Sequence, residues 1–322
     1  MIWPILLLVG LLIVLVVVLA LWPFGLAQIV SHPRPAASYD EAVQRLAAVQ
    51  ALEDEGIRPD CRTQLLTHGA RAARAVVLIH GYTAGVPQFV PLGRQFFDHG
   101  DNVLLVRLPH HGQVDRLSDE QGTLLATELA ALADEAVDIA AGLGEPVIVM
   151  GLSGGGVTTA WAAQTRPEVD RAVIIAPAFG FKQLPAAATL LLANVVPLLP
   201  DAYTWWEPAL QEKSGRPYTY PRYSRRALAQ ILRLGFATRA QARRRPPAAR
   251  SVVVVTNAND DAVDNAAAAA LAQIWRAAGA ANLVHYEFPA ELKLHHDLID
   301  PQAPEAQPEV VFPKLVELAD AV

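Results

Sequence analysis

The sequence contains a single cysteine, Cys61, and only two methionines. One thiol excludes an intramolecular disulfide framework and a metal site built from several cysteines. Basic residues are also few, because 26 Lys and Arg stand against 32 Asp and Glu and leave a net charge of −6. Nucleic-acid-binding proteins usually present a basic face. We therefore expect no nucleic-acid partner.

Charged residues make up only 18% of the chain, and none occurs before the linker that starts near residue 31. Residues 5–22 are an almost unbroken run of Leu, Val and Ile. As a helix this run would span roughly 27 Å, close to the thickness of a bilayer core. Trp3 and Trp22 lie near its two ends, where membrane interfaces favour aromatic side chains. These features predict that residues 1–30 form an uncleaved, single-pass membrane anchor.

A cleaved signal peptide is the alternative for the same residues. Signal peptides usually have a basic n-region and a shorter apolar core, and neither is present here. Small residues at positions 25–27 do offer a cleavage site. Arg34 is the first arginine and follows the apolar run, so the positive-inside rule gives a weak preference for a globular domain at the cytoplasmic face.

Residues 31–59 are interpreted as a linker followed by a helix. His32-Pro33-Arg34-Pro35 is typical of a short, stiff spacer. Ser38 and Glu41 have the spacing of a capping box, which predicts a helix that runs to about Glu55. Ser118 and Gln121 have the same spacing and predict the start of a second helix.

From residue 60 to the C-terminus, short apolar runs alternate with amphipathic helical patterns. This alternation is typical of an α/β fold with a mostly parallel sheet covered by helices on both faces. We therefore predict one domain over residues 60–322. The expected buried strands lie at residues 75–79, 102–106, 147–150, 171–176, 251–256 and 282–288.

The sequence Gly151-Leu152-Ser153-Gly154-Gly155 follows one of these strands and precedes a helical pattern. A Gly-x-Ser-x-Gly pattern in a strand–turn–helix setting is typical of a nucleophile elbow. Side chains at the first and last glycine would collide with neighbouring backbone, which is why glycine is needed there. The turn would raise the serine hydroxyl to a helix N-terminus, where amide donors and the positive end of the helix dipole gather.

Residues 178–250 interrupt the alternation of strands and helices. They contain an apolar helical stretch, two adjacent tryptophans and a Tyr/Pro-rich piece. An insertion of this length after the serine turn predicts a helical lid over the site. The alternative is a peripheral elaboration that only packs on the sheet.

Three motifs together resemble the α/β-hydrolase superfamily. They are His-Gly-Tyr-Thr at residues 80–83, Leu-Pro-His-His-Gly at residues 108–112 and the serine turn at residues 151–155. Within the superfamily they are most similar to bacterial carboxylesterases and monoacylglycerol-lipase-type enzymes, over about residues 60–320. Epoxide hydrolases and haloalkane dehalogenases of this superfamily use an Asp nucleophile, which Ser153 excludes here.

A serine nucleophile needs a base, and the base needs an acid partner. In this superfamily the chain order is Ser, acid, His. The resemblance implies His296 as the base, with His295 as the alternate, and Asp260 as the acid, with Asp261 as the alternate.

The same resemblance implies an oxyanion hole formed by the backbone amides of Tyr82 and Gly154. His80 and His111 belong to loop-shaping motif positions and receive no chemical role. No cofactor and no metal ion are implied.

These observations predict a membrane-anchored serine hydrolase that cleaves carboxylic esters through Ser153, Asp260 and His296. The apolar insertion and the expected anchor favour apolar acyl groups, such as those of a monoacylglycerol or related lipid. An amidase, peptidase, thioesterase or acyltransferase could use the same three residues. A non-catalytic, membrane-tethered binding protein is the rival from another class, and it would have lost members of the triad.

Overall fold

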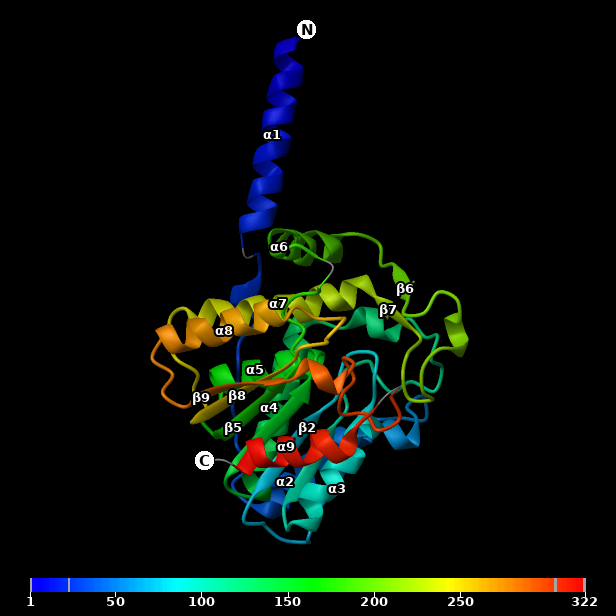
Figure 1. The fold of residues 1–322 in the computed structure, drawn as a ribbon, viewed down its shortest axis with the longest axis vertical. Coiled ribbons are helices and arrows are strands. Elements are labelled where there is room, and N and C mark those ends of the chain that lie inside the picture. The colour runs from blue at the N-terminus through cyan, green and yellow to red at the C-terminus, as the bar shows by residue number, and fades with distance from the viewer. Residues whose placement is uncertain (1, 23, 183, 304–305, 321–322) are drawn as a thin grey trace.

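The computed structural model describes residues 2–22, 24–182, 184–303 and 306–320. Its centre is a seven-stranded sheet with the order β1-β3-β2-β4-β5-β8-β9 (Figure 1). β1 is antiparallel to β3, and every other neighbouring pair is parallel. The strands are β1 (Gln64–Leu66), β2 (Ala75–Ile79), β3 (Asn102–Val106), β4 (Val147–Leu152), β5 (Val169–Ile175), β8 (Ser251–Asn257) and β9 (Leu283–Phe288).

Helices cover both faces of this sheet. Every residue of β2, β3, β4 and β8 is buried. Because successive side chains of a strand point to opposite faces, complete burial requires cover on both. The helices of the domain are α2 (Tyr39–Ala51), α3 (Val90–Asp98), α4 (Ala126–Leu143), α5 (Gly154–Thr165), α8 (Asn265–Ala277) and α9 (Pro308–Asp320), with 3₁₀ turns η2 (Pro59–Cys61), η3 (Val86–Gln88), η4 (Glu120–Thr123) and η7 (Ala290–Leu292). The predicted α/β fold with a mostly parallel sheet is confirmed.

The insertion after β5 contains two helices and a small hairpin. Figure 1 shows α6 above α7, with β6 and β7 beside them. α7 packs against α5, the helix that follows the serine turn. The elements of the insertion are α6 (Ala186–Val195), η5 (Val196–Leu198), β6 (Tyr203–Trp205), η6 (Gln211–Lys213), β7 (Arg222–Ser224) and α7 (Arg225–Ala242).

The prediction of an N-terminal transmembrane helix is wrong. α1 (Ile2–Leu21) contains the apolar run except for Trp22. Throughout the part of the chain that the structure describes, no helix combines the length and the apolarity that crossing a membrane requires. The predictions of a membrane partner and of a location at its cytoplasmic face depended on this helix and are not supported either. α1 extends away from the domain and lies next to α6 at its lower end (Figure 1).

A short turn, η1 (Leu26–Gln28), follows α1, and the residues after this turn are bound to the domain. Ser38 caps α2 by accepting a hydrogen bond from the Glu41 amide at 3.2 Å, and the Glu41 carboxylate accepts the Ala37 amide at 2.9 Å. The predicted capping box is therefore present in part: Ser38 caps the Glu41 amide, whereas the Glu41 carboxylate binds the amide of Ala37 instead of that of Ser38. The helix ends at Ala51, four residues earlier than expected.

The capping box predicted at Ser118 does not start a helix. Ser118 Oγ instead accepts the Glu120 amide within a turn, and α4 begins eight residues later at Ala126. There the carboxylate of Glu128 accepts the Leu125 amide at 2.8 Å. Glu128 thus satisfies an amide at the start of the helix that has no partner within the helix itself.

Candidate active site

The serine turn joins β4 to α5 in the geometry that the sequence predicts. A Cβ atom added to Gly155 would lie 2.2 Å from the Ile79 carbonyl oxygen, and one added to Gly151 would lie 2.4 Å from the Gly155 carbonyl oxygen. Such distances cannot be relieved by rotating a side chain, because the obstructing atoms belong to the backbone. The expectation that glycine is required at both positions is confirmed.

Ser153 occupies the N-cap position of α5 with a strained backbone. Its φ is 57° and its ψ is −114°, a conformation that non-glycine residues rarely adopt. The conformation is held in place because the Ser153 amide donates to the Ile175 carbonyl at 2.9 Å and its carbonyl accepts the Val157 amide at 3.0 Å. The surrounding backbone therefore presents a half-buried hydroxyl at the carboxyl edge of the sheet.

The amides of Tyr82 and Gly154 lie next to this serine. A Cβ atom added to Gly154 would be 3.3 Å from the Tyr82 nitrogen, and one added to Gly81 would be 3.6 Å from the Ser153 Cβ. Within the described part of the chain neither the Tyr82 nor the Gly154 amide has a hydrogen-bond acceptor. Two unpaired amides, one of them at the N-terminus of α5, can bind a developing negative charge.

Asp260 and His296 are brought together from loops that follow β8 and β9. His296 Nδ1 lies 2.8 Å from Asp260 Oδ2. The other oxygen, Asp260 Oδ1, accepts the amides of Ala262 at 3.0 Å and Val263 at 2.9 Å. Asp260 is only 2% exposed, so these bonds satisfy a carboxylate that is removed from water.

The pair changes the titration of both groups. Burial disfavours the imidazolium, yet the negative charges of Asp260, Asp297 and Asp261 raise the pKa of His296 above its ordinary value. Burial alone would raise the pKa of the Asp260 carboxyl. The positive charge and the hydrogen bond of His296 outweigh it, and the pKa of that carboxyl is lowered. The Nδ1–H of His296 donates to the carboxylate, which leaves Nε2 as the atom that can accept a proton.

The two alternates are placed differently from the residues they could replace. Asp261 and His295 are both exposed, whereas Asp260 and His296 are buried and half-buried. Asn257, at the end of β8, escaped the sequence analysis. Its Nδ2 donates to the carbonyls of Leu294 at 2.7 Å and His295 at 3.1 Å, so it fixes the backbone that carries His296.

His80 and His111 are neutral, buried supports of the loops around the site. Burial lowers the pKa of His80 to about 4 and that of His111 to about 3. His80 Nε2 accepts the Leu108 amide at 3.0 Å, and its Nδ1 lies 2.8 Å from the Gly81 carbonyl. His111 Nδ1 lies 2.8 Å from the Pro109 carbonyl. These bonds hold the two histidine-containing motifs against each other.

The Tyr82 side chain joins its loop to the insertion. Its hydroxyl donates to Gln121 Oε1 at 2.6 Å and accepts the Ser224 amide at 2.9 Å. Gln121, which the sequence analysis took for a capping residue, is fully buried. The Tyr82 ring is thus fixed between η4 and β7, together with the backbone amide it carries.

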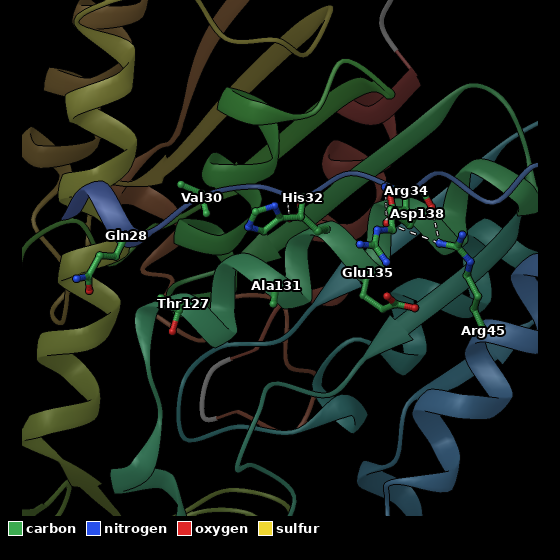
Figure 2. A pocket seen from close by; sticks show the side chains of 10 residues that line it. Gln28, Val30, His32, Arg34, Arg45, Thr127, Ala131, Glu135 and Asp138 are labelled. Carbon is green, nitrogen blue, oxygen red and sulfur yellow. Dashed lines mark hydrogen bonds and ion pairs between the residues drawn. The ribbon is translucent and has the colours of Figure 1, made fainter. Parts of the chain in front are cut away.

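A surface cavity of about 490 Å³ lies elsewhere, between the segment after α1 and helices α2 and α4. Figure 2 shows His32, Arg34, Arg45 and Glu135 along its wall, and none of the predicted site residues lines it. In the described ranges, no group of three or more His, Cys, Asp or Glu side chains could hold a metal ion.

Comparisons with known proteins agree with the fold. A family model described as "Alpha/beta hydrolase family" matches residues 76–293. A metagenome-derived lipolytic enzyme is 17% identical, with a TM-score of 0.61, over 82% of this chain and 98% of its own. The monoacylglycerol lipase of Paleococcus ferrophilus is 19% identical, with a TM-score of 0.62, over 80% and 97% of the two chains.

A third solved structure, a soluble variant of the monoglyceride lipase of Saccharomyces cerevisiae, is 14% identical with a TM-score of 0.61, over 80% of this chain and 90% of its own. Comparison with curated proteins finds no match. At these identities the solved structures show a shared fold, while the family model covers more than half of the sequence. The chain belongs to the alpha/beta hydrolase family, and its expected resemblance to carboxylesterases and monoacylglycerol lipases is confirmed.

Proposed function

We propose that the protein is a serine hydrolase that cleaves carboxylic esters through Ser153, His296 and Asp260. The observation that carries the proposal is the 2.8 Å contact between His296 Nδ1 and the buried Asp260 carboxylate. Ser153 follows β4, Asp260 follows β8 and His296 follows β9, and all three strands are part of one sheet and run in the same direction. Their carboxyl ends therefore lie at the same edge.

The reaction follows from these positions in two steps. Ser153 Oγ attacks the ester carbonyl carbon, and its proton passes to His296 Nε2, which then protonates the departing alkoxide. Asp260 stabilises the imidazolium and keeps the proton on Nδ1. Water activated by His296 next attacks the acyl-enzyme and releases the acid. In both steps the amides of Tyr82 and Gly154 bind the oxyanion.

Apolar acyl groups are the substrate class that the insertion supports best. α7 packs against α5 beside the serine turn, and Ile231 Cδ1 would lie 3.4 Å from a Cβ atom on Gly154. An aliphatic side chain next to the proposed oxyanion site favours a hydrocarbon chain over a charged acid. The solved lipases of the same fold act on monoglycerides or other lipids according to their names, which supports a monoacylglycerol or related lipid as the substrate here.

The test is hydrolysis of p-nitrophenyl esters from acetate to palmitate by the full chain. We expect hydrolysis to be lost in Ser153→Ala and His296→Ala and kept in His295→Ala, and we expect a fluorophosphonate to label wild type but not Ser153→Ala. Matched p-nitroanilides and acyl thioesters distinguish an amidase or a thioesterase. A folded wild-type protein that neither hydrolyses these compounds nor reacts with the fluorophosphonate would rule out a serine hydrolase and favour a binding protein.

A further inference from the structure

A chain of polar contacts, buried at Gln88 and partly exposed at Asp297, joins three loops of the proposed site. Gln88 Oε1 accepts the Gly81 amide at 2.8 Å, and Gln88 Nε2 donates to Asp297 Oδ1 at 3.4 Å. Asp297 directly follows His296, and its other oxygen lies 2.5 Å from Arg216 Nη2. The contacts therefore run from the oxyanion loop (residues 80–83) through η3 to the histidine loop (residues 293–300), and from there to the insertion.

The insertion makes a second attachment to the histidine loop. Arg216 Nε lies 2.9 Å from Asp300 Oδ2, and the Tyr218 hydroxyl donates to the same carboxylate at 2.7 and 2.9 Å. Asp300 is 0% exposed. A buried carboxylate is costly unless it is paired and hydrogen-bonded, so Arg216 and Tyr218 stabilise this loop only in the observed position.

The same piece of the insertion also binds the oxyanion loop. The Tyr220 amide donates to the Thr83 carbonyl at 2.8 Å, and Trp206 Nε1 donates to Thr83 Oγ1 at 3.0 Å. Residues 201–224, which we name the cap segment, thus hold the loop with the proposed oxyanion amide and the loop with the proposed base at once. A segment with these bonds on both sides fixes the spacing between the two loops.

We propose that Arg216 is a positioning residue, which acts with Gln88 through Asp297 to hold His296 in register with the oxyanion loop. The proposal rests on the proposed function, because it assigns a role to His296 as the base. Arg216 does not reach the reacting atoms itself. Its Nη2 donates a hydrogen bond to Asp297, and its Nε forms an ion pair with Asp300. The single ammonium group of a lysine cannot reproduce these two contacts of a planar guanidinium.

Charge gives the proposal a signature that a purely structural role would lack. Three carboxylates act on His296: Asp260 and Asp261 from the loop after β8, and Asp297 from its own loop. Two cations lie near these carboxylates. Arg216 of the cap segment pairs with Asp297, and Lys182 Nζ donates to the Asp260 carbonyl at 2.8 Å. Arg216 offsets the negative charge of Asp297. Without it, that charge acts on His296 unopposed and raises the pKa of the imidazole further.

The experiment compares Arg216→Met, Arg216→Lys and Asp297→Asn with Arg225→Met in the full chain. Arg225 is an exposed arginine that bonds within the insertion, to Thr204 Oγ1 at 3.1 Å, and serves as the matched control. Steady-state hydrolysis of p-nitrophenyl butyrate gives kcat, KM and the dependence of kcat/KM on pH for each variant. Circular dichroism establishes that each variant is folded.

We expect Arg216→Met to lower kcat by about 10- to 100-fold with little change in KM, and Arg216→Lys to recover part of the loss. The acidic limb of kcat/KM should move to higher pH in Arg216→Met and to lower pH in Asp297→Asn. Arg225→Met should resemble wild type. If Arg216→Met does not fold, the opposite limb shift in Asp297→Asn and the partial activity of Arg216→Lys test the same proposal.

Wild-type kinetics and an unmoved limb in Arg216→Met, or an unmoved limb in Asp297→Asn, would overturn the positioning role while leaving the proposed function intact. If the proposed function is wrong, the result differs, because wild type and Ser153→Ala would hydrolyse p-nitrophenyl butyrate equally slowly. That result would reject both proposals.

Discussion

At the scale of single residues, the site depends on groups in which the bonds at one end hold the other end in place. Asp260 accepts backbone amides on one oxygen and His296 on the other. Tyr82 supplies an unpaired amide at one end and a bound hydroxyl at the other. In each case one end fixes the position of the other, so that a change of a few atoms alters the chemistry without altering the fold.

The Asp260→Asn variant should lose activity through the tautomer of His296. The amide oxygen of Asn can still accept the Ala262 and Val263 amides, which turns its NH₂ group toward His296 Nδ1. Nδ1 must then act as an acceptor, and Nε2 carries the proton and cannot take one from Ser153. We expect kcat to fall by about 10³- to 10⁴-fold while the melting temperature stays near that of wild type.

Asp261→Asn is the matched control for this change, since Asp261 is exposed and adjacent in sequence. It should retain nearly all activity. Equal activity of Asp260→Asn and Asp261→Asn would show that Asp260 does not orient the base.

The Tyr82→Phe variant separates the tyrosine hydroxyl from its backbone amide. The loss of the hydroxyl leaves the buried Gln121 Oε1 and the Ser224 amide without this partner. We expect the free energy of unfolding to decrease by about 1–3 kcal/mol and kcat to fall by roughly tenfold, because the amide remains but is held less firmly. Urea denaturation and ester hydrolysis measure the two effects.

Tyr203→Phe is the control, because the Tyr203 hydroxyl donates to the Asp119 carbonyl at a more exposed place on the insertion. It should change neither quantity by much. If Tyr82→Phe behaves like Tyr203→Phe, the hydroxyl has no positioning role.

At the scale of elements, the β4–α5 turn has no room for a side chain at two of its glycines, Gly151 and Gly155. A methyl group at Gly155 would meet the Ile79 carbonyl oxygen at 2.2 Å and the His80 carbonyl oxygen at 2.5 Å. Both obstacles belong to the end of β2 and the start of the oxyanion loop. Any shift that relieves the collision must therefore move either Ser153 or the loop that carries Tyr82.

We expect Gly155→Ala to destabilise the protein by about 3 kcal/mol or more and to abolish fluorophosphonate labelling of Ser153. Gly10→Ala is the control, because a Cβ atom at Gly10 meets nothing within 4 Å. It should leave unfolding of the domain and labelling unchanged. A Gly155→Ala protein with wild-type stability and labelling would contradict the close approach of β2 and α5.

Elements specified by local sequence were predictable, and those specified by distant contacts were not. The strands at β2, β3, β4 and β8 are short apolar runs, and the serine turn needs glycine at fixed positions, so both are visible in the sequence. The start of α4 was misplaced because Ser118 and Gln121 have the spacing of a capping box, whereas Gln121 is used by Tyr82, 39 residues away. The spacing alone carries no information about such a partner.

The same distinction applies to the candidate site. Asp260 and His296 were predicted from their order and from a family resemblance, and the structure places them in contact. Arg216 and Gln88 were not predicted, because each joins loops that are far apart in the sequence. The N-terminal anchor was predicted from composition over residues 5–22, and composition alone does not establish that a helix can cross a membrane.

At the scale of the whole molecule, residues 31–36, which precede α2, are hydrogen-bonded to the domain. The Arg34 amide donates to Asp138 at 2.9 and 3.0 Å, and the two residues lie side by side in Figure 2. The His32 amide donates to Asp134. Behind these carboxylates lies Arg166, which is 0% exposed and bonds to both of them. One buried cation thus supports the attachment of residues 31–36 to α4.

The Arg166→Met variant tests this attachment. Methionine leaves the Asp134 and Asp138 carboxylates without their buried cation, and breaking such a network costs about 3–5 kcal/mol of unfolding free energy. Because the two carboxylates also accept the His32 and Arg34 amides, we expect faster hydrogen exchange over residues 31–36 in the same variant. Denaturation and exchange measured by mass spectrometry give both readouts.

Arg71→Met provides the comparison, since Arg71 pairs with Glu145 at 3.1 Å on the surface, with both side chains largely exposed. Surface pairs of this kind contribute less than about 1 kcal/mol, and the exchange of residues 31–36 should not respond to this change. If Arg166→Met loses stability without faster exchange in that segment, Arg166 supports α4 alone. If both variants behave alike, the segment is held by its backbone bonds without help from the buried cation.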